Sequence, residues 1–346
     1  MDRRFLLLMF ALFSCMISGA QTMEYEAVNF IAGLPAELQT LQERAVRMAI
    51  NGDSSGLEEV RSARNFPSKL PEGVISTDIN GIYRIYTPLK KAERPLPLLI
   101  YFHGGGWCFG SINSCSSFCA SLAKEVQIAV LAVEYPLAPE NPYPAALVAG
   151  VDALNYAAEN AVMLGIDSGA ISIGGDSAGG NLALATALRM VSMQETLKDS
   201  AAQNKLPKIR SLVLFYPVVK AWNDASESWQ KYGSGYGLDS KIMETFNEAY
   251  IGGNDPGLPL ISPYCASTEH LSQLPPTLIV NADHDILRDQ GREMFERMKM
   301  ANVDVIRKVL PGTTHLFITV AGQPTAFRKS VSLTKEFLCD KYFPQM

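Results

Sequence analysis

A serine lies at the centre of a short glycine-rich pattern, Gly175-Asp176-Ser177-Ala178-Gly179, in this chain of 346 residues. The apolar run before the pattern, residues 170–173, predicts a buried strand, and residues 182–191 after it predict a helix. This order of strand, pattern and helix favours a sharp turn that exposes a serine hydroxyl at the top of a sheet. The two outer glycines permit the tight turn and the close approach of strand and helix. Ser177 is therefore the predicted nucleophile.

A second glycine-rich pattern, His103-Gly104-Gly105-Gly106-Trp107, directly follows the apolar run 96–102. Three successive glycines allow main-chain N–H groups to point into a cavity. Acyl transfer requires such donors, because negative charge develops on the carbonyl oxygen in the transition state. We predict the N–H groups of Gly105, Gly106 and Ala178 as these donors, with His103, Gly104 and Asp176 supporting them.

A serine hydroxyl is a weak nucleophile until a base takes its proton, and the chain has four histidines. His103 belongs to the glycine pattern, which it is expected to order by hydrogen bonding. His270 lies in a polar linker, and His284 adjoins the candidate acids too closely along the chain. His315, in residues 311–315 that we expect to form a loop after the last strand, is the predicted base.

The acid that orients this base should follow a late strand. Three aspartates, Asp283, Asp285 and Asp289, come after the apolar run 277–281. Asp285 is the preferred acid, while Asp283 is expected to brace the turn and Asp289 to lie on the following helix. The resulting chain order of serine, aspartate and histidine is typical of one fold class with a strand–turn–helix nucleophile.

Strands and helices alternate along most of the chain. Runs that predict strands occur at 96–102, 128–133, 170–173, 211–216, 277–281 and 305–309, with helices predicted at 114–125, 144–160 and 182–191. This alternation predicts an α/β fold, a mostly parallel central sheet with helices on both faces. Alternating apolar residues on both sides of Asn80-Gly81 predict a hairpin that adds antiparallel strands at one edge.

Two segments depart from this alternation. Residues 21–65 are predicted to be helical, and an insertion at about 220–259 is rich in Gly, Ser, Trp and Tyr. We expect both to form a helical cap over the carboxyl ends of the strands, where open α/β sheets bind ligands. The catalytic domain then spans residues 66–346.

The composition narrows the class of protein further. With 47% hydrophobic residues the chain can bury a large core, and its net charge of −5 excludes a basic surface for nucleic acid. No cysteine or histidine spacing is typical of a metal site, so no metal is expected. Six irregularly spaced cysteines do not predict a disulfide framework, although a single disulfide is left as an alternative. Cys115 and Cys119 are expected to be buried.

The N-terminus has the layout of a secretory signal peptide. Arg3 and Arg4 precede an apolar run at 5–17, and small residues at 18–20 offer a cleavage site. We expect a secreted or periplasmic protein with the signal at about 1–20 and no membrane span after processing. A membrane anchor, through an uncleaved segment or lipidation at Cys15, is the alternative.

Together these patterns resemble the hormone-sensitive-lipase family of esterases, also called bacterial lipolytic family IV, over roughly residues 70–340. The resemblance rests on both glycine patterns, on residues 135–146 and on residues 285–289. It implies an α/β-hydrolase fold, a helical cap, no cofactor and esterase activity, often toward short acyl chains. The first aspartate of the family's acid motif is catalytic, which supports Asp285. Pro136 replaces the family's arginine, and Leu316 follows the histidine where the family often has glycine.

We therefore expect a serine carboxylesterase that acts on small-molecule esters of short to medium acyl chains through an acyl-enzyme. An amidase or a sugar deacetylase with the same residues is the rival among enzymes. A non-catalytic receptor is the rival class, because the plant gibberellin receptor resembles this family but lacks the catalytic histidine. His315 argues against that role. The oligomeric state is left open, a homodimer included.

Overall fold

The computed structural model of the protein describes residues 19–63, 65, 68–90, 93–198 and 200–340. The predicted signal peptide lies outside these residues except for positions 19 and 20, and it stays a prediction. Residues 19–33 are helical. Among the helices that the structure describes, none combines the length and the apolar character needed to cross a membrane.

The core is an eight-stranded sheet in the order β1-β2-β4-β3-β5-β6-β7-β8. The strands are β1 (Val74–Ile79), β2 (Tyr83–Pro88), β3 (Leu96–Phe102), β4 (Ala129–Val133), β5 (Ile166–Asp176), β6 (Ile209–Phe215), β7 (Thr277–His284) and β8 (Val305–Thr314). The β1–β2 and β2–β4 pairs are antiparallel and the others parallel. The predicted parallel sheet with an antiparallel hairpin at one edge is confirmed.

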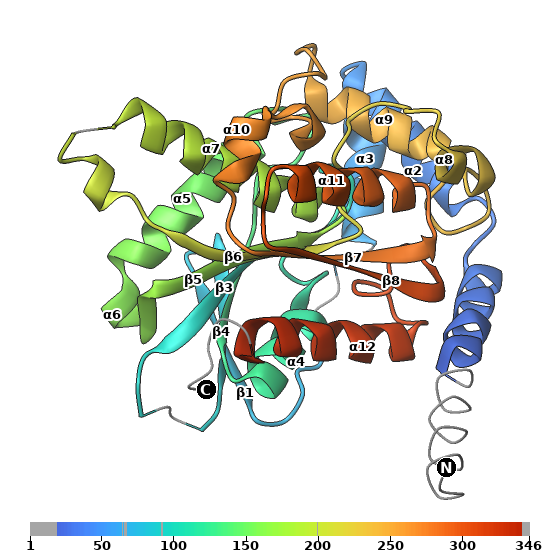
Figure 1. Ribbon diagram of the computed structural model, residues 1–346. Coiled ribbons are helices and arrows are strands. Elements are labelled where there is room, and N and C mark those ends of the chain that lie inside the picture. Colours follow the sequence, from blue (N-terminus) through green and yellow to red (C-terminus); the bar gives the residue numbers. More distant parts are fainter. Residues whose placement is uncertain (1–18, 64, 66–67, 91–92, 199, 341–346) are drawn as a thin grey trace, which may run out of the picture.

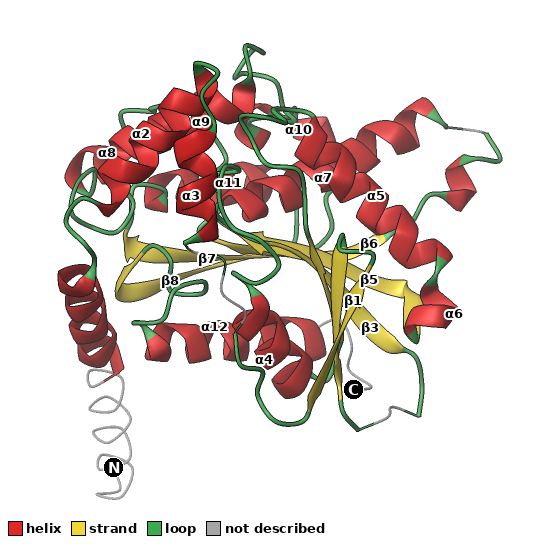
Figure 2. Cartoon of the chain, turned by 180° about the vertical axis from the view of Figure 1, so that it is seen from behind, coloured by secondary structure: helices red, strands yellow, loops and turns green. Residues whose placement is uncertain are grey.

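Helices cover both faces of the sheet (Figure 1). They are α2 (Leu38–Ile50), α3 (Ser55–Ser62), α4 (Ser116–Val126), α5 (Ala145–Glu159), α6 (Ala161–Leu164), α7 (Ala178–Thr196), α8 (Glu227–Lys231), α9 (Ser240–Ile251), α10 (Thr268–Ser272), α11 (Arg288–Met300) and α12 (Pro324–Lys335). On one face α4 and α12 pack together, and α5, α7 and α11 lie on the other, seen from behind in Figure 2.

The central strands are apolar on both sides because helices bury both faces. In β4 every residue is buried, and in β3 only the first residue is partly exposed. Two buried clusters result, one on each side of the sheet. The buried cysteines Cys115 and Cys119 belong to the cluster around α4, and these two residues are free thiols, as are Cys108 and Cys265.

Two strand ends differ from the sequence prediction. The strand predicted at 170–173 continues as β5 to Asp176, so it reaches the residue before Ser177. Residues 311–314 are not a loop, because β8 continues to Thr314 and pairs with β7 up to His284, and the turn begins only at His315. The pairing shifts register beyond Ala282, and this irregularity lets an apparent turn sequence with Gly312 remain in the strand.

The two segments expected to form a cap lie together in space. Helix α2 packs against α9 of the 220–259 insertion, and Figure 1 shows α2, α3, α8 and α9 gathered on one side of the molecule. Arg47 of α2 donates a hydrogen bond of 2.7 Å to Thr245 of α9. Packing between helices far apart in the sequence thus forms one helical layer.

Candidate active site

Ser177 occupies a strained turn between β5 and α7. Its backbone has φ 55° and ψ −118°, a conformation that non-glycine residues rarely adopt. The turn is held because the Ser177 N–H donates to the Phe215 carbonyl oxygen at 2.9 Å. A Cβ on Gly175 would lie 2.5 Å from the Phe102 carbonyl oxygen, so glycine is required there. The sharp turn predicted from the sequence is present.

The structure brings Ser177, His315 and Asp285 together, although they are far apart in the sequence. His315 Nε2 lies 3.0 Å from Ser177 Oγ, and His315 Nδ1 lies 2.7 Å from Asp285 Oδ2. All three side chains are buried, at most 5% exposed. Because a carboxylate only accepts, His315 Nδ1–H donates to Asp285 and leaves Nε2 free to accept from the serine hydroxyl.

Further hydrogen bonds restrain Asp285 and the backbone on either side of His315. Asp285 Oδ1 accepts a hydrogen bond of 2.9 Å from the Leu287 N–H. The buried Gln323 accepts from the Thr314 N–H at 3.0 Å and donates to the His315 carbonyl oxygen at 3.2 Å. Two positions beyond Gln323, Thr325 donates to Glu26 of the N-terminal helical residues 19–33. The backbone around His315 is therefore clamped from several sides.

The remaining aspartates and histidines lie where they have other partners. Asp283 Oδ2 accepts from the Gly312 N–H at 3.1 Å, and Asp289, on α11, accepts from the Ser228 N–H at 2.9 Å. His284 packs against the Tyr232 ring, and His270 contacts Glu195. None of these four side chains contacts Ser177 among the hydrogen bonds of the described residues.

The glycine pattern after β3 has the backbone that glycine favours. Gly105 and Gly106 have φ of +129° and +59°. A Cβ on Gly105 would clash with the Phe109 carbonyl oxygen, and one on Gly106 would clash with the Phe246 ring. Within the described residues no protein acceptor takes the N–H of either glycine. Ala178 begins α7, so its N–H is also one of the helix donors without an intrahelical partner.

Two buried ionisable groups support this loop. Burial lowers the pKa of His103 to about 4, so its neutral ring donates from Nδ1 to the Gly104 carbonyl oxygen at 2.9 Å. Burial raises the pKa of Asp176 to about 6, although hydrogen bonds from Tyr101 and Gly104 lower it in part. His103 contacts the backbone of the loop, and among the hydrogen bonds of the described residues it has none to Ser177.

Three further residues support the loop, and among them only Tyr135 lies in a sequence pattern, the stretch 135–146. Tyr101 donates to Asp176 at 3.0 Å, and Tyr135 donates to the His103 carbonyl oxygen at 2.7 Å. Arg61 of α3 donates to the carbonyl oxygens of Cys108 and Ala138 at 2.8 and 2.9 Å. The guanidinium of Arg61 thus joins the segment after the glycine pattern to the segment after Tyr135.

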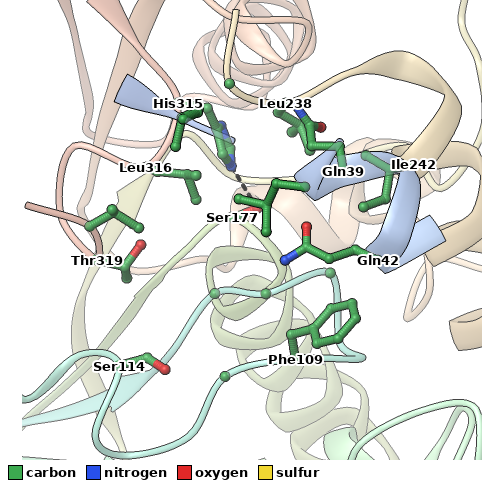
Figure 3. A pocket seen from close by; sticks show the side chains of 18 of the residues that line it. Gln39, Gln42, Phe109, Ser114, Ser177, Leu238, Ile242, His315, Leu316 and Thr319 are labelled. Atoms are coloured by element: carbon green, nitrogen blue, oxygen red, sulfur yellow. Dashed lines mark hydrogen bonds between the residues drawn. The ribbon is translucent and has the colours of Figure 1, made fainter. Parts of the chain in front are cut away.

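The arginine of the family pattern is absent at Pro136, which is exposed. The other departure, Leu316, has φ +72°, a backbone conformation suited to the glycine that the family often has there. Its side chain lines the cavity beside His315 (Figure 3). The second departure therefore places a large apolar group where the family often has none.

Ser177 and His315 lie in the wall of a cavity of about 850 Å³. Residues from the glycine loop, from α2 and from the segment 234–246 complete the wall. Its volume falls within the range of small-molecule sites, about 300–1,000 Å³. In the described part of the chain, no group of three or more His, Cys, Asp or Glu side chains could hold a metal ion.

A parallel sheet, a strained serine between strand and helix, and a histidine beyond the last strand define the α/β-hydrolase class. Comparison with known proteins gives the same result. Residues 99–319 match a family model described as the alpha/beta hydrolase fold. The chain belongs to the α/β-hydrolase fold family, and its predicted place there, the hormone-sensitive-lipase family, is confirmed.

Relatives in this family carry hydrolase names. The chain is 37% identical over 225 residues to an ethyl acetate hydrolase of Pseudomonas putida, covering 65% of this chain and 67% of that protein. It is 34% identical over 259 residues to an arylesterase of Saccharolobus solfataricus, covering 74% and 78%. An ester hydrolase from the metagenome of Lake Arreo has a similar structure, with a TM-score of 0.70 and 28% identity over 90% of this chain and 97% of that one.

Proposed function

We propose that the protein is a serine carboxylesterase that hydrolyses carboxylic esters through an acyl-enzyme on Ser177. The observation that carries the proposal is the hydrogen-bonded series Ser177–His315–Asp285 at 3.0 and 2.7 Å, in the wall of a cavity that a small molecule can enter. The names of the relatives support a carboxylic ester hydrolase as the enzyme class.

In the proposed mechanism, His315 Nε2 takes the Ser177 proton as the oxygen attacks the ester carbonyl carbon. Asp285 keeps the ring oriented and stabilises the imidazolium that forms. The imidazolium then protonates the leaving alcohol as the C–O bond breaks, which leaves the acyl group on Ser177. Water enters, gives its proton to His315 and releases the carboxylic acid, and the serine recovers its proton.

The tetrahedral intermediate places a negative charge on the former carbonyl oxygen. We assign the N–H groups of Gly105, Gly106 and Ala178 to that oxygen, because they have no protein acceptor in the described residues. Donors fixed in advance stabilise the transition state without reorganisation, and one such donor is worth about 10²–10³ in kcat. The loop contacts of His103, Gly104 and Asp176 would hold these donors in place.

Replacement of the nucleophile tests the proposal. Ser177→Ala should reduce kcat toward p-nitrophenyl esters by about 10⁴–10⁶, since no other group in the series can form the acyl-enzyme. The substrates range from acetate to palmitate, with an arylamide beside them to separate esterase from amidase. Short to medium chains should be hydrolysed fastest.

Ser192→Ala is the matched control, because Ser192 lies on the same helix and its hydroxyl only donates to the Leu188 carbonyl oxygen. It should keep full activity. Ester turnover by folded Ser177→Ala at the level of the unchanged protein would contradict the proposal.

A further inference from the structure

Helix α2 carries a glutamine in a row of otherwise apolar buried positions. Gln42, Val46 and Ala49 lie at the spacing of one helix face, and all three are buried against the rest of the protein. An apolar side chain at position 42 would complete this row. Gln42 is only 4% exposed, so its amide has lost nearly all contact with bulk water.

The amide nitrogen of Gln42 has no hydrogen-bond partner in the described protein. A buried donor without a partner costs about 1–3 kcal/mol, so such groups usually have a role. Other buried polar atoms in the described residues also lack partners, but among them Gln42 alone lines the cavity with Ser177. Figure 3 shows its amide end directed from α2 toward Ser177.

In the part of the chain that the structure describes, no acceptor lies within hydrogen-bond distance of the Gln42 amide nitrogen. Ile242 of α9 and Phe109, which follows the glycine pattern, line the cavity near Gln42 (Figure 3). The other glutamine of α2 in this wall, Gln39, is already engaged, since its Oε1 accepts from the Asp239 N–H at 2.8 Å. Gln39 thus fixes the helical layer, whereas Gln42 is left free to bind a ligand.

We propose that Gln42 Nε2 donates a hydrogen bond to a second oxygen of the substrate, separate from the scissile ester carbonyl. This inference rests on the proposed esterase function. The substrate class is then an ester that carries a hydroxyl, ether or additional carbonyl oxygen in the part that lies against α2. An ester with only hydrocarbon in that part would cover the amide without accepting a hydrogen bond from it, so the cost of removing the amide from water would not be offset.

Matched pairs of esters test this assignment. In the acyl series, p-nitrophenyl valerate is compared with p-nitrophenyl 3-methoxypropionate, in which an ether oxygen replaces one CH₂ group. In the alcohol series, pentyl acetate is compared with 2-ethoxyethyl acetate, which differs in the same way. The ratio of kcat/KM within each pair is measured in the unchanged protein and in Gln42→Met, so that differences in intrinsic reactivity cancel.

In at least one series, the preference for the oxygen-bearing ester should be about tenfold greater in the unchanged protein than in Gln42→Met. Gln42→Asn, whose amide is one CH₂ shorter, should lose the same preference. Arg44→Gln, on the exposed side of α2, should keep it.

A second readout separates substrate binding from a structural role. Since the amide nitrogen has no protein partner, Gln42→Met should unfold at the same temperature as the unchanged protein or higher. Equal ratios in both series for the two proteins, or a fall in both Tm and turnover of every ester alike, would overturn the assignment. Failure of the proposed function itself looks different, because no ester would then be hydrolysed by the unchanged protein.

Discussion

The cavity has a sheet side, where Ser177 and His315 at the ends of β5 and β8 line the wall and Asp285 after β7 lies behind His315, and a helix side, formed by α2 and α9. On the sheet side these three side chains are hydrogen-bonded to one another and to the protein, including the 2.9 Å bond from the Leu287 N–H to Asp285. On the helix side Gln42 presents an unpaired donor. Reactive groups thus need partners within the protein to be held in position, whereas a selective group keeps its bonding capacity for the substrate.

The largest effect should come from breaking the sheet side at its acid. Asp285→Asn should lower kcat by about 10⁴, because an amide neither stabilises the imidazolium nor fixes the tautomer of His315. The measurement is kcat with p-nitrophenyl butyrate. Asp283→Asn is the matched control, since Asp283 braces Gly312 instead, and it should lose less than tenfold. A greater loss in the control than in Asp285→Asn would show that Asp285 is not the acid.

An intermediate effect concerns Asp176, which lies behind the sheet side without lining the cavity. Burial raises its pKa to about 6 from 3.8, so folding favours the protonated carboxyl. The associated stability is present below pH 4 and is lost as pH rises through 6, at a cost of roughly 3 kcal/mol. Asp176→Asn should therefore exceed the unchanged protein in unfolding free energy by about that amount at pH 7.5, and by little at pH 4.

Urea unfolding at the two pH values measures this difference. Burial lowers the pKa of His103 to about 4, so His103 makes stability rise with pH. This contribution is the same in both proteins and cancels in their difference. A difference between Asp176→Asn and the unchanged protein that is the same at both pH values would contradict the prediction.

The smallest effect should come from the boundary between the two sides. Leu316→Gly removes a side chain from the cavity and relieves a left-handed backbone that costs about 1–2 kcal/mol. The ratio of kcat/KM for the octanoate to the acetate p-nitrophenyl ester should rise a few-fold, roughly 1 kcal/mol. Leu316→Ala opens the same space without relieving the strain. It should shift the ratio of kcat/KM by the same amount, but its Tm should be lower than that of Leu316→Gly. An unchanged ratio in both variants would show that Leu316 does not limit chain length.

The sheet side was more predictable from sequence than the helix side for a physical reason. The turn at Ser177 and the loop at Gly105 need glycine at fixed short spacings, and such local constraints leave a pattern in the sequence. His315 followed by elimination among four histidines. Its strand context was predicted wrongly, because pairing with β7 continues through a stretch that reads as a turn.

The supporting contacts could not be predicted, since they join residues far apart in sequence. Nothing local distinguishes Gln323 or Arg61 from any other polar residue, and only the fold brings them to His315 and to the glycine loop. Gln42 reads as an ordinary helix residue. Its meaning appears only when burial, the missing partner and the cavity are known together.

The bond between Glu26 and Thr325 would have a consequence for the protein if the predicted signal peptide is cleaved. Glu26 lies six positions beyond the predicted cleavage site, and Thr325 stands two positions from Gln323, which holds the backbone of His315. The first segment of a processed chain would therefore be anchored next to His315, the proposed general base. Trimming by an exopeptidase that stopped at residue 21 would leave this anchor intact, whereas trimming a few residues further would remove it. Cleavage at that site would thus leave the contact between the N-terminal residues and the segment that holds His315 in place.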